Sequence, residues 1–114
     1  MIQVIMGLKG SGKTKHLIEM VNAAQDKTSG CVVCIEKGSK LIHEINNKTR
    51  LVDISEYAIE TAEQLYGFVC GVLASNYDLT DLFIDSAPDG ASANISPIHV
   101  GFFANISICL ICRG

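Results

Sequence analysis

The feature that most constrains this chain is a glycine-rich octapeptide, residues 7–14, between two segments of different periodicity. Residues 2–6 (IQVIM) are a short apolar run rich in β-branched side chains, which predicts a buried strand. The segment from Thr14 to Asp26 has the spacing of an amphipathic helix, with apolar residues at Leu17, Ile18, Val21 and Ala24. A strand, a tight glycine-rich turn and a helix are therefore expected in immediate succession.

The octapeptide GLKGSGKT fits the pattern G-x-x-x-x-G-K-[ST], known as Walker A. Glycines let such a loop wrap a phosphate with its N–H groups turned inward, and the following helix adds its positive N-terminal end. Lys13 is the expected catalytic residue, since its charge reaches the β- and γ-phosphates, and the Thr14 hydroxyl is expected to ligate Mg²⁺. The alternative is a plain strand–helix turn with an exposed lysine. The residues expected to contact nucleotide are Gly7, Leu8, Lys9, Gly10, Ser11, Gly12, Lys13 and Thr14.

A second motif, Leu82-Phe83-Ile84-Asp85, is an apolar strand that ends in an acid and resembles a Walker B segment. We expect Asp85 to hold Mg²⁺ beside Thr14, with Asp81 as the less favoured choice. The structural alternative is that Asp85 caps a turn. Because Ser86 follows, the sequence places no carboxylate base beside the metal and predicts slow turnover.

Further elements alternate along the chain. Apolar runs predict strands at 31–35, 49–54 and 82–85, and residues 58–75 have helical spacing, so the order β-α-β-(β)-α-β predicts a mostly parallel sheet. Gly30 is expected to adopt a left-handed turn after the first helix. Gly67 and Gly71 lie four residues apart in the second helix, where close packing on a sheet would justify them. Glu36 and Lys37 follow a strand and are weak substrate-side candidates.

Charge divides the chain into residues 1–85, the predicted nucleotide-binding core, and 86–114, a low-charge tail. The core has 19 charged residues and the tail only Asp89 and Arg113. The apolar segment 98–112 either supplies final strands of the sheet or is an extension foreign to the fold, the product of truncation or frameshift. Exposed, it would promote homo-oligomers.

Composition excludes several classes of protein. A chain of 114 residues forms a single domain, and a formal net charge of −3 argues against a nucleic-acid partner. No apolar run is long enough to cross a membrane and no secretory signal is recognised, so we expect a cytoplasmic protein without a membrane partner. The pairs Cys31–Cys34 and Cys109–Cys112 lie in predicted strands, where positions i and i+3 face opposite sides, so buried thiols are favoured over zinc ligands.

The motifs GLKGSGKT and LFID resemble those of the P-loop NTPase superfamily. More narrowly, MIQVIMGLKGSGKT, CVVCIEKG, RLVDISEY, YGFVCG and LFIDS, about three-quarters of the chain, resemble small bacterial P-loop ATP-binding proteins sometimes labelled twitching-motility ATPases. The resemblance implies ATP binding by residues 7–14 with Asp85 at the metal, and does not imply a motor. The chain departs from the family after Ser86.

The sequence thus predicts an α/β, three-layer P-loop fold whose sheet is either complete or truncated at the C-terminus. The expected function is binding of ATP or GTP with Mg²⁺, with slow hydrolysis. One alternative is a small-molecule or nucleoside kinase, which resembles thymidine kinases in its P-loop-first layout and requires an acceptor pocket near Glu36. The other is a non-catalytic, truncated interaction module.

Overall fold

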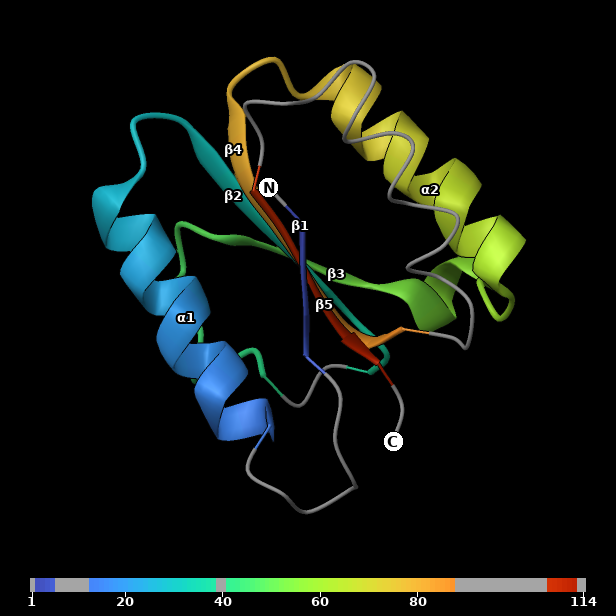
Figure 1. The fold of residues 1–114 in the computed structure, drawn as a ribbon, viewed down its shortest axis with the longest axis horizontal. Coiled ribbons are helices and arrows are strands. Elements are labelled where there is room, and N and C mark those ends of the chain that lie inside the picture. The colour runs from blue at the N-terminus through green and yellow to red at the C-terminus, as the bar shows by residue number, and fades with distance from the viewer. Residues whose placement is uncertain (1, 6–12, 39–40, 88–106, 113–114) are drawn as a thin grey trace.

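The computed structural model describes residues 2–5, 13–38, 41–87 and 107–112, with side chains for residues 15–38 and 41–85. This part of the chain has an α/β fold built from five strands and two α-helices (Figure 1). In chain order the elements are β1 (Ile2–Ile5), α1 (Lys13–Lys27), β2 (Cys31–Glu36), β3 (Arg50–Asp53), the 3₁₀ turn η1 (Ile54–Tyr57), α2 (Ala62–Ser75), β4 (Leu79–Ala87) and β5 (Ser107–Cys112).

The strands form one parallel sheet in the order β1-β5-β4-β2-β3. Strand β5, from the low-charge tail, lies between β1 and β4, with Ile108 beside Ile2 on one side and Leu82 on the other. Residues 107–112 are therefore an inner strand of the sheet, and they join β1 to the rest of it. The predictions for residues 88–106 lie outside the described residues.

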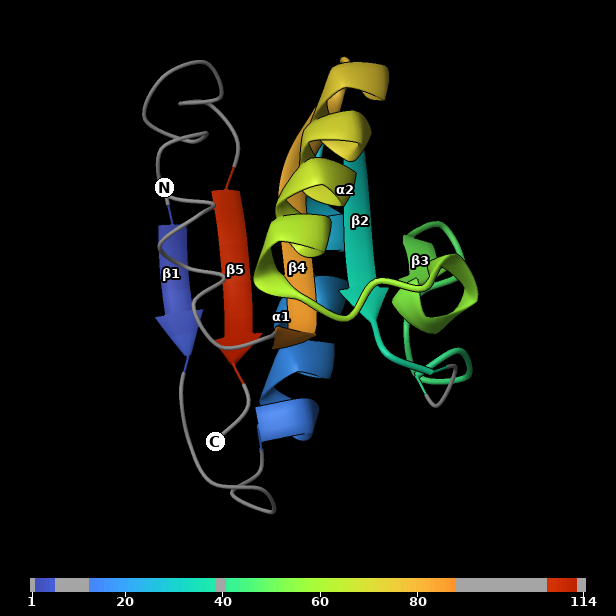
Figure 2. The same ribbon diagram turned by 90° about the vertical axis from the view of Figure 1, so that its right-hand side faces the viewer.

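A helix covers each face of the sheet, α1 on one side and α2 on the other (Figure 2). Side chains of β2 alternate between two cores, as the period of a strand requires. The core on the α1 face contains Leu17, Val21, Val32, Cys34 and Phe83. The core on the α2 face contains Val33, Ile35, Leu65, Val69 and Ile84. Burial on both faces explains why β2 is a continuous apolar run.

Helix α2 begins at a capping box. The Thr61 hydroxyl accepts a hydrogen bond from the Gln64 N–H at 3.2 Å, and Gln64 Oε1 accepts one from the Thr61 N–H at 3.1 Å. The helix then buries Leu65, Val69 and Leu73, four residues apart, against the sheet. No helix in the described parts of the chain has the length and apolar character needed to cross a membrane.

Gly30 corrects one expectation. Among the described glycines, Gly38 has a positive φ, of 102°, and Gly30 does not. Glycine is required at position 30 for steric reasons instead, because a Cβ there would lie 1.9 Å from the Asp78 carbonyl oxygen. That oxygen accepts a hydrogen bond from the Cys31 N–H at 2.7 Å, so the close approach brings β2 and the start of β4 together.

The connection between β2 and β3 is attached to α1. Residues 41–45 form one turn, in which the Leu41 carbonyl accepts hydrogen bonds from the N–H groups of Glu44 and Ile45. Leu41 and Ile45 are both buried in the core on the α1 face. The Asn22 side chain accepts a hydrogen bond from the Asn46 N–H at 2.8 Å and donates one to the Glu44 carbonyl at 3.0 Å. After the end of β2, the chain therefore continues over the face of the sheet that α1 covers.

Candidate functional site

The predicted phosphate-binding segment joins the carboxyl end of β1 to the first turn of α1. Residues 7–12 lie outside the described residues, as do the side chains of Lys13 and Thr14. The backbone of Lys13 and Thr14 is helical, so the motif's lysine and threonine begin α1. Strand, connecting segment and helix follow one another in the order that the motif requires.

Asp85 lies near the carboxyl end of β4, and only 4% of its surface is exposed. Phe83, two residues earlier, belongs to the core on the α1 face, so Asp85 projects toward that same face. Because all strands are parallel, the carboxyl ends of β1 and β4 lie at the same edge of the sheet. Asp85 and the start of α1 are thus at one edge and on one face.

Glu36 is the neighbour of Asp85 that the sequence does not indicate. Ile35 of β2 pairs with Ile84 of β4, and Glu36 and Asp85 each come directly after this last pair, so their Cα atoms are close neighbours on adjacent strands. Adjacent strands are about 4.8 Å apart, and paired residues of parallel strands face the same side. Glu36 is fully buried, and its Oε1 accepts a hydrogen bond from the Leu41 N–H at 3.4 Å.

Asp53 extends this arrangement to β3, since its Cα pairs with that of Glu36. Its Oδ1 accepts hydrogen bonds from the Ser55 hydroxyl at 2.6 Å, the Gly38 N–H at 2.8 Å and the Ser55 N–H at 2.9 Å. The bond from the Ser55 hydroxyl is the main reason that the pKa of Asp53 lies below its usual value, and the two backbone bonds add to it. Asp53 therefore positions the turns after β2 and β3.

The acidic edge, defined here as Asp85, Glu36 and Asp53, has the donor chemistry of a magnesium site. Mg²⁺ prefers oxygen ligands and usually takes one or two carboxylates together with substrate phosphates. Among side chains that the structure describes, no group of three or more His, Cys, Asp and Glu is placed to hold a metal ion alone. A single carboxylate such as Asp85 fits the smaller contribution that Mg²⁺ requires when phosphate oxygens complete its coordination.

The cysteines follow the strand geometry expected of them. Cys31 packs toward the α2 face and Cys34 toward the α1 face. The prediction that the two thiols face opposite sides of the sheet is confirmed, and Cys34 is buried whereas Cys31 is half-buried. Cys109 and Cys112 lie in β5, but their side chains are outside the described residues, as is the surface expected to support homo-oligomers.

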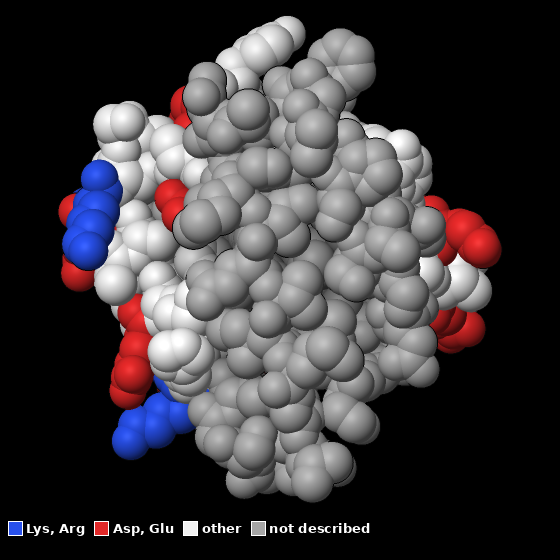
Figure 3. Space-filling view, in the orientation of Figure 1, with Lys and Arg blue, Asp and Glu red and all other residues white. Residues whose placement is uncertain are grey.

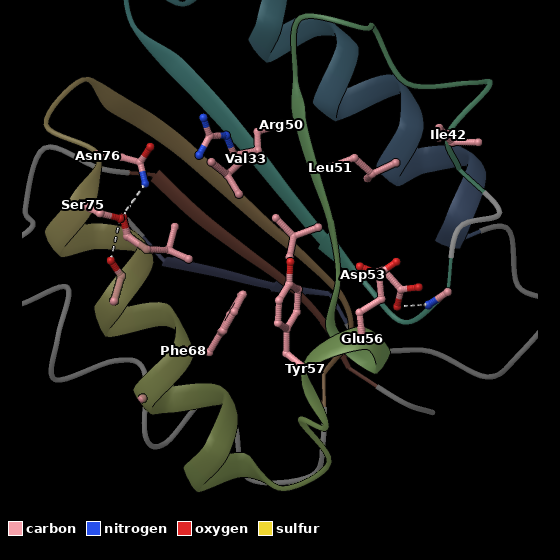
Figure 4. Close-up of a pocket in the computed structure, with 15 residues that line it drawn as sticks. Val33, Ile42, Arg50, Leu51, Asp53, Glu56, Tyr57, Phe68, Ser75 and Asn76 are labelled. Carbon is pink, nitrogen blue, oxygen red and sulfur yellow. Dashed lines mark hydrogen bonds between the residues drawn. The ribbon is translucent and has the colours of Figure 1, made fainter.

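A pocket of about 790 Å³ lies between β3, η1 and α2 (Figure 4). It includes Gly38, two residues beyond Glu36, as the kinase alternative requires of an acceptor pocket. Most of its wall, however, comes from the α2 face, where Val33 and Phe68 line it, whereas Glu36 and Asp85 project toward the α1 face. Comparison of the sequence with protein-family models and with curated proteins gives no match.

Proposed function

We propose that the chain binds a nucleoside triphosphate, ATP or GTP, together with Mg²⁺ at the acidic edge. The observation that carries the proposal is that two buried acids, Glu36 and Asp85, directly follow the paired residues Ile35 and Ile84 at the carboxyl edge of the sheet. Ligands of open α/β sheets bind at this edge, and anions favour the N-terminal end of a helix. The pattern GLKGSGKT ends in the first turn of α1.

Each residue of the site has a distinct role in this proposal. N–H groups of residues 7–12 hold the phosphates, and Lys13 neutralises their charge. Thr14 and Asp85 hold Mg²⁺, which when bound neutralises charge on the β- and γ-phosphate oxygens. In this proposal Glu36, which follows Ile35 as Asp85 follows Ile84, accepts a proton from an attacking water. We expect slow hydrolysis, because Glu36 Oε1 already accepts a hydrogen bond from the Leu41 N–H and because Ser86 supplies no second base.

Calorimetry with ATP and Mg²⁺ tests the phosphate contact. We expect a micromolar Kd for the natural chain and a Kd about 10- to 100-fold weaker for Lys13→Ala, because a hydrogen bond to a charged group contributes roughly 1.5–3 kcal/mol. Lys15→Ala is the matched control, since it removes the same charge from an exposed position two residues later. Equal affinity of the natural chain and Lys13→Ala would refute the proposed site.

The metal contact is tested by repeating the titration in EDTA. Asp85→Asn should abolish the gain in affinity that Mg²⁺ gives and leave metal-free binding nearly unchanged. Asp81→Asn is the control on the same strand, four residues toward its amino end, where Asp81 accepts a hydrogen bond from the Thr80 hydroxyl at 2.8 Å. Glu36→Gln should lower phosphate release and preserve nucleotide affinity. An unchanged Mg²⁺ dependence in Asp85→Asn would remove Asp85 from the site.

A further inference from the structure

The pocket between β3, η1 and α2 has the size of a small-molecule site, since such sites range over roughly 300–1,000 Å³. Its wall is largely apolar, with Val33, Val52, Phe68 and Val72 (Figure 4). Polar residues lie at two ends. Asp53 and Glu56 flank the carboxyl end of β3, and Arg50, Ser75 and Asn76 lie near its amino end.

Gly67 and Gly71 keep the helix side of this pocket open. Close packing on the sheet was expected to justify them, and that expectation is wrong for the described part of the chain, where a Cβ at either position would meet no atom within 4 Å. Both glycines line the pocket. Each costs α2 about 1 kcal/mol of helix propensity relative to alanine, and no packing contact offsets this cost. The fold therefore gives no reason for them, whereas an occupant of the pocket does.

The topology independently points to the same place. The connection after β2 packs Leu41 and Ile45 on the α1 face, whereas the chain after β3 continues through η1 into α2 on the opposite face. Where the connections of neighbouring strands diverge in this way, an open α/β sheet forms a crevice that commonly binds ligands. The pocket reaches this crevice at Gly38 and Asp53.

Charge determines the kind of ligand that fits. Residues 51–85 contain no Lys, Arg or His and seven acids, which are Asp53, Glu56, Glu60, Glu63, Asp78, Asp81 and Asp85. On the β1 side of the molecule, which Figure 3 shows, the blue side chains lie on the α1 side, and the described side chains on the α2 side are red or white. The pocket itself has one cationic lining residue, Arg50, at the amino end of β3, and two acids, Asp53 and Glu56, at the other end. Within the pocket, Glu56 adjoins an aromatic pair, Tyr57 and Phe68, whose ring centroids are 5.7 Å apart. Carboxylates beside aromatic rings form a typical binding site for organic cations.

We propose that this pocket binds a small organic cation with a flat, apolar body. The cationic group lies against Glu56 and Tyr57, at the Asp53 end of β3, and the body lies over Phe68 and Gly71. The part of β3 between Arg50 and Asp53 is three residues or roughly 10 Å long, and this length limits the length of the ligand. Strands β1 and β3 are at opposite edges of the sheet, four spacings or roughly 19 Å apart, so the pocket is distant from the phosphate-binding segment after β1, although Asp53 belongs to both the pocket and the acidic edge.

Two-dimensional ¹H–¹⁵N NMR of the full chain tests the proposal with three probes that share one ring system. Tryptamine is cationic, indole is neutral and indole-3-propionate is anionic. We expect millimolar tryptamine to shift the amide signals of Gly67, Phe68 and Gly71, indole to bind about two- to five-fold more weakly, and indole-3-propionate to bind least. Absence of shifts with tryptamine, or equal binding of the cation and the anion, would overturn the proposal.

Two variants with matched controls locate the probe. Gly71→Leu fills open space and should weaken tryptamine binding at least about ten-fold, whereas Ala74→Leu, an equal change at an exposed position outside the pocket, should not. Glu56→Gln should weaken binding about two- to five-fold, the range of an exposed charge pair, and Glu60→Gln should leave it unchanged. Tryptamine binding that Gly71→Leu leaves intact would place the probe elsewhere and refute the assignment. Nucleotide affinity should be the same in all four variants, so failure of one site does not decide the other.

Discussion

Replacing Gly67 and Gly71 by alanine should stabilise this protein. Both residues are inside α2, which runs from Ala62 to Ser75, and neither has a positive φ. Among the residues that the structure describes, the added methyl groups would meet no atom within 4 Å and so create no clash. Alanine exceeds glycine in helix propensity by about 0.5–1 kcal/mol, partly because it restricts the unfolded chain. The double variant should therefore gain about 1–2 kcal/mol in the free energy of unfolding.

Urea denaturation followed by circular dichroism measures this gain, and a thermal melt should show a rise of roughly 4 °C for each kcal/mol. Gly30→Ala is the opposite case, because its Cβ would lie 1.9 Å from a backbone oxygen and the strands would have to separate. Overpacking of this kind costs about 1–3 kcal/mol. A loss of stability in Gly67→Ala or Gly71→Ala would show that the helix face is closely packed, and would contradict the open pocket.

Two further predictions concern local hydrogen bonds. Thr61→Ala removes the hydroxyl that caps α2 and should cost about 1 kcal/mol of stability, whereas Thr61→Ser should retain most of it, as measured by urea denaturation. Asp53→Asn should destabilise the chain in a pH-dependent way. Because folding lowers the pKa of Asp53, its ionised form stabilises the fold above about pH 4, and this contribution is lost as the pH falls through the folded pKa. The difference in urea midpoint between Asp53→Asn and the natural chain should thus shrink from pH 6 to pH 2.5, and a constant difference would exclude the ionised carboxylate as its cause.

Local pattern was sufficient to predict the type of most elements. The run CVVCI predicted a buried strand because both faces of β2 are covered, and a strand covered on both sides needs no polar alternation. The spacing of Leu65, Val69 and Leu73 predicted α2 because these residues face one core. Boundaries differ by a few residues where the sheet continues beyond the apolar run, as in β4, which begins at Leu79 rather than Leu82.

Features that depend on distant parts of the chain were not predictable. Sequence order gives no sign that β5 lies between β1 and β4, because that pairing joins the two ends of the chain. Along the chain the neighbour of Asp85 is Ser86, which is no base, whereas across the sheet its neighbour is Glu36, a carboxylate that is 49 residues away in sequence. The spacing of Gly67 and Gly71 would be the same in a helix that packs closely on a sheet and in a helix that borders a pocket. These two cases are distinguished only by the position of β3 at the edge of the sheet.

Strand β2 supplies residues to both proposed sites. Val33 faces the pocket under α2, and Glu36, three residues later, faces α1 beside Asp85. Side chains of a strand alternate between faces, so residues of β2 that are three positions apart face opposite sides of the sheet. The two sites therefore lie on different faces. A slip of β2 by one residue would turn Glu36 toward the apolar core of the α2 face and remove Val33 from the pocket. Pairing of β2 with β4 on one side and with β3 on the other opposes that slip, so a single register maintains the acidic edge and the pocket together.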